Sequence, residues 1–208
     1  MRPVIILFAK APLPGRVKTR LIPPLSPSSA ALLYTAFVSD IIERLQPLRR
    51  HIDIELHTDV PTDAWPTQAL QHEGHLGLKM LQAMSLELAL GRPQAMIVGS
   101  DAPTLPLGHL EHLLQSSAEV ALGPAEDGGF YAIACRKVSD RMFDGVAWSS
   151  ANTLEQTVSA ALESGLTVEL GAPWWDVDTP DDLARLMAAG DLPRHTSRTL
   201  AMIKADDN

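Results

Sequence analysis

The chain has a single cysteine, Cys135, and no long hydrophobic run. One cysteine excludes an intramolecular disulfide, and its apolar surroundings predict a buried structural thiol. The apolar stretch at the N-terminus, Val4 to Phe8, is too short for the core of a signal peptide. No segment approaches the roughly 18 apolar residues that a membrane span needs. We therefore expect a soluble, cytoplasmic protein with no membrane span.

Acidic residues are absent from residues 1–39, although the whole chain has a net charge of −8. This segment carries +5 and the remainder −13, because its cations are Arg2, Lys10, Arg16, Lys18 and Arg20. Binding to a nucleic acid polymer needs an extended basic surface, so an acidic chain argues against such a partner. A local basic cluster favours a small anionic ligand, and a solvated basic face is the alternative.

Three common motifs are also missing from the sequence. The chain contains no G-x-G-x-x-G fingerprint for dinucleotides, no G-K-[ST] of a Walker A loop and no G-x-S-x-G nucleophile elbow. Their absence argues against a dehydrogenase, a P-loop nucleotide hydrolase and an α/β-hydrolase.

Hydrophobic periodicity predicts alternating strands and helices. Strands are expected at 3–9, 51–57, 95–99, 118–123, 129–135 and 166–170, and helices at 28–45, 76–90, 106–116, 152–164 and 180–189. This alternation predicts an α/β fold with a mostly parallel sheet covered by helices on both faces. We predict one domain over residues 1–190. The tail, 191–208, lacks clear periodicity, and disorder and packing on a partner subunit of a homo-oligomer both agree with its sequence.

The loop from Lys10 to Arg20 follows the first predicted strand, at the end of a parallel sheet where ligands bind. Two prolines stiffen this loop. Gly15 permits a backbone conformation that other residues resist, and it lets the chain approach a ligand closely. The cations Lys10, Arg16, Lys18 and Arg20 can bind phosphate oxygens. A basic surface loop without a ligand is the alternative.

Aspartates lie next to two other predicted elements. Asp101 comes directly after the buried strand at 95–99, where its carboxylate can hold Mg²⁺ or cap the next helix. Thr179 and Pro180 begin a helix in the usual manner, which leaves Asp176 and Asp178 unexplained. These two carboxylates can complete a metal site with Asp101, and anions near a helix start are also tolerated without a metal.

The loop from Pro124 to Gly128 joins two predicted strands and contains Glu126 and Asp127. A tight turn explains two acids followed by two glycines. The functional interpretation is a loop that approaches the substrate, in which Gly128 and Gly129 leave room for the ligand.

Four motifs spread over nearly the whole chain resemble those of the nucleotide-diphospho-sugar transferase superfamily. They are FAKAPLPGRVKTRL (8–21), GSDAPTLP (99–106), GPAEDGGFYAIA (123–134) and WDVDTPDDL (175–183). The resemblance implies a GT-A-type, Rossmann-like three-layer sandwich. Within the superfamily, the chain is most similar to the bacterial glycosyltransferases associated with radical-SAM and selenium-domain proteins. Ala102 stands where close relatives often have cysteine, Trp148-Ser149 replaces a common Trp-Gly, and the first loop lacks the several glycines of molybdopterin-type nucleotidyltransferases.

The resemblance also implies a role for individual residues. The expected nucleotide site consists of Ala9, Lys10, Gly15, Arg16, Lys18, Arg20 and Ser100. Asp101 and Asp178 are expected to hold Mg²⁺ or Mn²⁺. The expected catalytic residues are Asp101, Asp127 and Lys18, and Asp127 is expected to face a small-molecule acceptor. Transfer of a sugar from a nucleotide-sugar, transfer of a nucleotidyl group from a triphosphate to a phosphorylated or carboxylated acceptor, and nucleotide binding without turnover all remain open.

Overall fold

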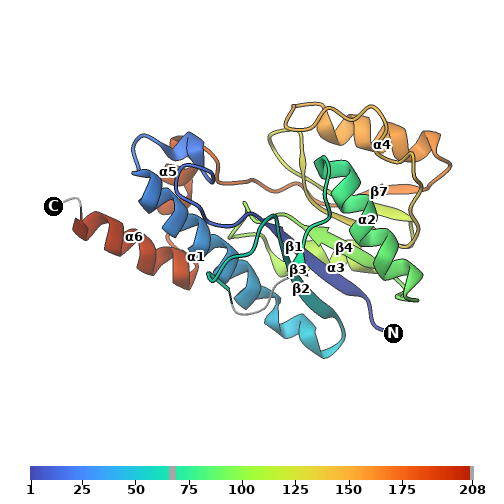
Figure 1. Cartoon of the computed structure of the whole chain (residues 1–208), viewed down its shortest axis with the longest axis horizontal. Coiled ribbons are helices and arrows are strands. Elements are labelled where there is room, and N and C mark those ends of the chain that lie inside the picture. Colours follow the sequence, from blue (N-terminus) through green and yellow to red (C-terminus); the bar gives the residue numbers. More distant parts are fainter. Residues whose placement is uncertain (66–68, 207–208) are drawn as a thin grey trace.

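The computed structural model describes residues 1–65 and 69–206. Within them, seven strands form one sheet in the order β3-β2-β1-β4-β6-β5-β7 (Figure 1). The strands are β1 Val4–Ala9, β2 Asp53–Thr58, β3 Ala69–Leu70, β4 Ala95–Val98, β5 Val120–Pro124, β6 Phe130–Cys135 and β7 Val168–Leu170. The mostly parallel α/β sheet predicted from the sequence is confirmed. β6 runs antiparallel to β4 and β5, because a tight turn joins it to β5.

Helices cover both faces of this sheet. They are α1 Pro27–Leu45, α2 Leu76–Ala89, α3 Leu107–Gln115, α4 Thr153–Glu163, α5 Pro180–Ala188 and α6 Arg194–Asp206, with short 3-10 helices at Thr19–Leu21 and Gln46–Arg50. Alternate residues of β1 belong to two separate cores. Ile5 and Leu7 pack in the core with α1 and α3, whereas Ile6 packs in the core with α2 and α4. Cys135 is fully buried, as predicted.

The strand order changes direction at β1. β1 pairs with β2 on one side and with β4 on the other, in parallel in both cases. Loops that leave β1 and β4 diverge at such a point, and a crevice opens between them at the carboxyl ends of the strands. The Lys10–Arg20 loop and Asp101 follow these two strands, so the topology itself brings them together.

The C-terminal residues 194–206 form α6, which packs on α1 of the same chain (Figure 1). The alternative of a disordered tail is therefore wrong for residues 194–206, and packing on a partner subunit stays a prediction. The buried Asp40 of α1 accepts hydrogen bonds from the backbone N–H groups of His195 and Thr196, both at 2.8 Å, and from the Thr196 hydroxyl. A carboxylate from α1 thus caps the start of α6.

Asp40→Ala is expected to destabilise the protein by about 2 to 3 kcal/mol, because it leaves buried N–H groups without their charged acceptor. For a chain of this size, the melting temperature should fall by roughly 5 to 10 °C. Asp40→Asn is the matched control, since it keeps one acceptor oxygen and should lose about half as much. A melting temperature for Asp40→Ala equal to that of the wild type would show that α6 contributes little to stability.

No helix among the described residues has the length and apolar composition needed to cross a membrane.

Candidate functional site

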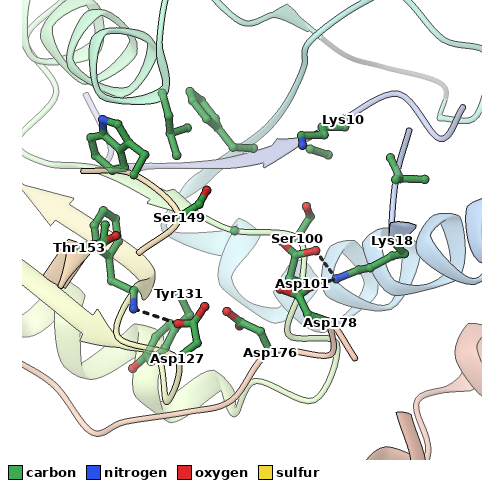
Figure 2. A pocket seen from close by; sticks show the side chains of 18 of the residues that line it. Lys10, Lys18, Ser100, Asp101, Asp127, Tyr131, Ser149, Thr153, Asp176 and Asp178 are labelled. Carbon is green, nitrogen blue, oxygen red and sulfur yellow. Dashed lines mark hydrogen bonds and ion pairs between the residues drawn. The ribbon is translucent and has the colours of Figure 1, made fainter. Parts of the chain in front are cut away.

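A cavity of about 460 Å³ lies at the carboxyl ends of β1 and β4 (Figure 2). The predicted site residues that line it are Ala9, Lys10, Arg16, Lys18, Arg20, Ser100, Asp101, Asp127 and Asp178. Gly15 is not among the lining residues, although its φ of 76° confirms the conformational reason for glycine there. Loops 160 residues apart in the sequence therefore converge on one cavity, as the motifs predicted.

Lys18 lies between the two predicted metal ligands. Its ammonium contacts an oxygen of Asp101 and donates to Asp178 Oδ1 at 2.8 Å, and its side chain is 2% exposed. Burial alone would lower the pKa of Lys18, but the charges of Asp101 and Asp178 outweigh it and raise the pKa. Lys18 has a left-handed backbone, with φ of 47°. The Lys18 ammonium is thus paired with two carboxylates in this structure. The predicted direct contact of Lys18 with phosphate requires the ammonium to move away from them.

Asp101 does not cap the helix that follows it. α3 begins at Leu107 and its N-cap is Pro106, so the capping alternative is wrong. Thr179 does cap α5, where its side chain and that of Asp182 form a capping box. Neither Asp101 nor Asp178 is therefore used as a helix cap, and both direct an oxygen to the ammonium of Lys18.

Backbone hydrogen bonds fix residues 174–178 beside the strand ends. Val177 donates to the carbonyl oxygen of Asp101 at 2.9 Å, and Trp174 donates to the carbonyl oxygen of Pro124 at 3.0 Å. Glu126 donates to the carbonyl oxygen of Trp174 at 2.9 Å. This strip runs across the ends of β4 and β5, so its alternate residues Asp176 and Asp178 both reach the cavity.

Asp176 is the least favourably placed charge in the site. Burial raises the pKa of Asp176 to about 7, and the charges of Asp101 and Asp127 add to this effect. Figure 2 shows the Asp176 and Asp127 side chains facing each other on one side of the cavity. The sequence indicated Asp176 as a metal-ligand candidate, but its burial among acids follows from the backbone strip and could not be predicted.

Tyr34 of α1 joins two predicted nucleotide-binding residues. Its hydroxyl accepts a hydrogen bond from the backbone N–H of Lys10 at 2.9 Å and shares another with the Ser100 hydroxyl at 2.7 Å. Burial raises the pKa of Tyr34 to about 12, so the phenol stays neutral. Tyr34 lines the cavity. Sequence reasoning missed it, because a tyrosine in an apolar helical stripe is indistinguishable from a core residue.

The turn between β5 and β6 presents Asp127 to the cavity. Asp127 Oδ1 accepts a hydrogen bond from the N–H of Gly129 at 2.9 Å, which closes the turn. Gly128 has φ of 89°, and an added Cβ would lie 2.0 Å from the carbonyl oxygen of Ala151. The space at Gly128 therefore accommodates the backbone of the 147–154 segment rather than a ligand, which corrects our interpretation of this glycine. Gly129 does line the cavity.

The carboxylates of Asp101 and Asp178 are chemically suited to a divalent metal. In the structure their oxygens converge on the ammonium of Lys18. Mg²⁺ is commonly bound by one or two carboxylates, with the other positions filled by water and substrate phosphates. Hard oxygen donors of this kind suit Mg²⁺ and Mn²⁺.

The chain is similar to bacterial proteins of known structure. The family model described as "Uncharacterized protein conserved in bacteria (DUF2064)" matches residues 55–150. The crystal structure of a "putative nucleotide-diphospho-sugar transferase" from Desulfovibrio desulfuricans G20 is 33% identical to the chain, with a TM-score of 0.83. The alignment covers 99% of this chain and 95% of that one. The chain belongs to the same family as this Desulfovibrio protein.

More distant structures share the fold. CMP:2-keto-3-deoxy-manno-octonic acid synthetase complexed with CTP is 15% identical, with a TM-score of 0.58 over 91% of this chain and 98% of that one. The inositol-1-phosphate CTP transferase from T. maritima is 12% identical, with a TM-score of 0.51 over 98% and 96%. At these identities the similarity concerns the fold alone. None of the curated proteins compared with the chain matches it, and the radical-SAM-associated group stays a prediction.

Proposed function

We propose that the protein is a divalent-metal-dependent transferase that uses a nucleotide or nucleotide-diphospho-sugar donor. The observation that carries this proposal is the convergence of Asp101 and Asp178 on one cation, beside a basic loop at the switch point of the sheet. The family relationship to the Desulfovibrio protein supports it, as does the similar fold of the synthetase complexed with CTP and of the CTP transferase.

The residues of the site suit a reaction without a protein nucleophile. Asp101 and Asp178 would hold Mg²⁺ or Mn²⁺, and the metal would supply neutralisation of the charge that develops on the leaving phosphate. Lys10, Arg16 and Arg20 would bind phosphate oxygens from the other side. Lys18, once displaced from the carboxylates, would add a further positive charge. Positioning and charge neutralisation then account for catalysis.

A second candidate is nucleotidyl transfer from a triphosphate. The cations Lys10, Arg16, Lys18 and Arg20 favour it, because a leaving pyrophosphate carries more charge than a nucleoside diphosphate that leaves a sugar. A protein of the same fold that only binds a nucleotide is the alternative outside enzymes. Tight Mg²⁺-dependent binding of a donor without turnover of any donor would support that alternative.

Thermal shift with nucleoside triphosphates and nucleotide-sugars, in Mg²⁺ and in EDTA, tests the proposal. We expect a rise in melting temperature with one donor class in Mg²⁺, and little or none in EDTA. A ligand at 100 times its Kd stabilises by about 2.7 kcal/mol, which corresponds to roughly 5 to 10 °C here. Preference for a nucleotide-sugar favours glycosyl transfer, and preference for a triphosphate favours nucleotidyl transfer. The absence of a shift with every donor would refute nucleotide binding.

A further inference from the structure

The charges that line the cavity are separated into two ends. Among the described residues, every lysine and arginine that lines it belongs to the segment 10–20. Lys18 is moreover neutralised by Asp101 and Asp178. Figure 2 shows Lys18, Asp101 and Asp178 on one side of the cavity, Asp127 and Ser149 on the other, and Asp176 between Asp127 and the first group. The end away from the basic loop thus has carboxylates and hydroxyls, and none of the lining cations originates there.

The acidic end is built on a rigid frame. The Thr153 hydroxyl donates to the carbonyl oxygens of Ala147 and Ser150, at 2.9 and 2.8 Å, and accepts from the N–H of Ser150. Gly128 packs directly on the backbone of Ala151, and Leu154 donates to the carbonyl oxygen of Gly128 at 2.8 Å. The 147–154 segment and the β5–β6 turn are therefore locked together, with Asp127 on one and Ser149 on the other.

Ser149 has an unusual backbone in this frame. Its φ is 58°, a left-handed conformation that glycine adopts more easily than serine. Ser149 lines the cavity, and Figure 2 shows its side chain on the same side of the cavity as Asp127. Strained backbone conformations of this kind cluster at ligand-binding sites. Ser149 supplies a polar group at a position where glycine would fold at least as well.

An aromatic wall completes the acidic end. Trp148 and Phe130 both line the cavity, with ring centroids 6.3 Å apart and planes inclined by 72°. The Trp148 ring packs against Gly77 of α2, where an added Cβ would lie 2.6 Å from it. The ring is thus held in place, and apolar carbon can lie against it while carboxylates and a hydroxyl receive polar groups.

From this arrangement we infer that the acceptor is a neutral molecule that carries several hydroxyl groups and one apolar face. Hydroxyl groups can donate to Asp127 and Asp176, whereas a phosphate or carboxylate at this end would face the Asp127 carboxylate with no lysine or arginine of the described lining beside it. The apolar face would lie on Trp148 and Phe130. The inference rests on the proposed function, and it selects the acceptor class within it. It disfavours the phosphorylated or carboxylated acceptor of the nucleotidyl-transfer candidate.

Two matched glucosides test the inference. We would measure the Kd of phenyl β-D-glucopyranoside and of its 4-carboxyphenyl analogue by saturation-transfer NMR in Mg²⁺ at neutral pH. The two probes differ in charge and share hydroxyls and an aromatic face. Wild type is expected to bind the neutral probe at least about tenfold more tightly, since a tenfold ratio corresponds to 1.4 kcal/mol of repulsion. Asp127→Asn keeps the side-chain oxygen that accepts from the Gly129 N–H and closes the turn. In this variant the ratio of the two Kd values should fall severalfold, because the carboxylate analogue binds more tightly.

Ser149→Gly provides a variant that should fold at least as well as the wild type. It removes the hydroxyl and the left-handed strain, so we expect weaker binding of the neutral probe with no loss of melting temperature. Equal or tighter binding of the carboxylate analogue by wild type, or no binding of the neutral probe, would overturn the inference. Nucleotide binding is measured on the same preparation. If nucleotides bind and the charge preference is absent, the acceptor inference alone fails; if no nucleotide binds, the proposed function fails.

Discussion

Asp101→Asn and Asp178→Asn are each expected to lower donor turnover by on the order of 10³-fold, because a bound metal contributes several kcal/mol of charge stabilisation. Each variant should also lose the Mg²⁺-dependent rise in melting temperature with the donor. The amide keeps the size of the side chain but removes the charge that attracts a divalent cation. Turnover is followed by release of nucleotide or pyrophosphate, and donor binding by thermal shift.

Asp181→Asn is the matched control for both variants. Asp181 is an exposed aspartate in the first turn of α5, three residues after Asp178, and it does not line the cavity. The same change of charge there should leave turnover within about twofold of wild type, as expected for a surface substitution away from the site. If Asp101→Asn and Asp178→Asn behaved like Asp181→Asn, the metal assignment would be wrong.

Asp176→Asn is expected to stabilise the metal-free protein at pH 8 by about 2 to 4 kcal/mol, or roughly 5 to 15 °C. Burial holds the pKa of Asp176 at about 7, against an ordinary value of 3.8. Between these values the folded protein retains a proton that the unfolded chain has released. Wild-type stability is therefore lost as the pH rises from about 4 to about 7, and it stays lost above. The amide has no charge to bury, so it escapes this loss.

The gain from Asp176→Asn should disappear near pH 4, where the carboxyl is protonated in the native state and the charge penalty is absent. Melting temperatures in EDTA across this pH range measure the difference. Asp181→Asn again serves as the control, because its side chain is exposed and should show no comparable trend. A gain of the same size at pH 4 and pH 8 would indicate a packing effect rather than a charge effect.

Much of the fold could be predicted from the sequence, because the elements carry strong patterns. β1 alternates between two cores, which makes it continuously apolar and recognisable. The helices at 76–89 and 180–188 begin and end within a residue or two of the predicted positions. Helix α6 was not predicted, because its start is capped by Asp40, which lies 155 residues before His195 in the sequence. A capping residue on another helix leaves no pattern in the local sequence.

The gathering of these residues around one cavity was also predictable, since polar residues that follow strands of a parallel sheet lie at one edge. Their pairing was not. Opposite charges at Lys18, Asp101 and Asp178 meet only once the first loop folds over the strand ends, and the sequence assigned Lys18 to phosphate. Gly128 was misread for a similar reason. The absence of a side chain at Gly128 makes room for the backbone of Ala151. Ala151 lies in a separate loop, so the local turn sequence could not predict this contact.

The strip at 174–178 is held by main-chain hydrogen bonds to Asp101, Pro124 and Glu126, none of which depends on the side chains that it presents. Positions 176 and 178 are therefore free to change chemically while their placement stays constant. The same scaffold could accept imidazoles in place of carboxylates, which would move the preference of the proposed metal site from magnesium toward zinc. Because the backbone of the strip is held independently of its side chains, residues 176 and 178 are suitable positions for redesign. The same independence would allow specificity to diverge at these positions among related proteins.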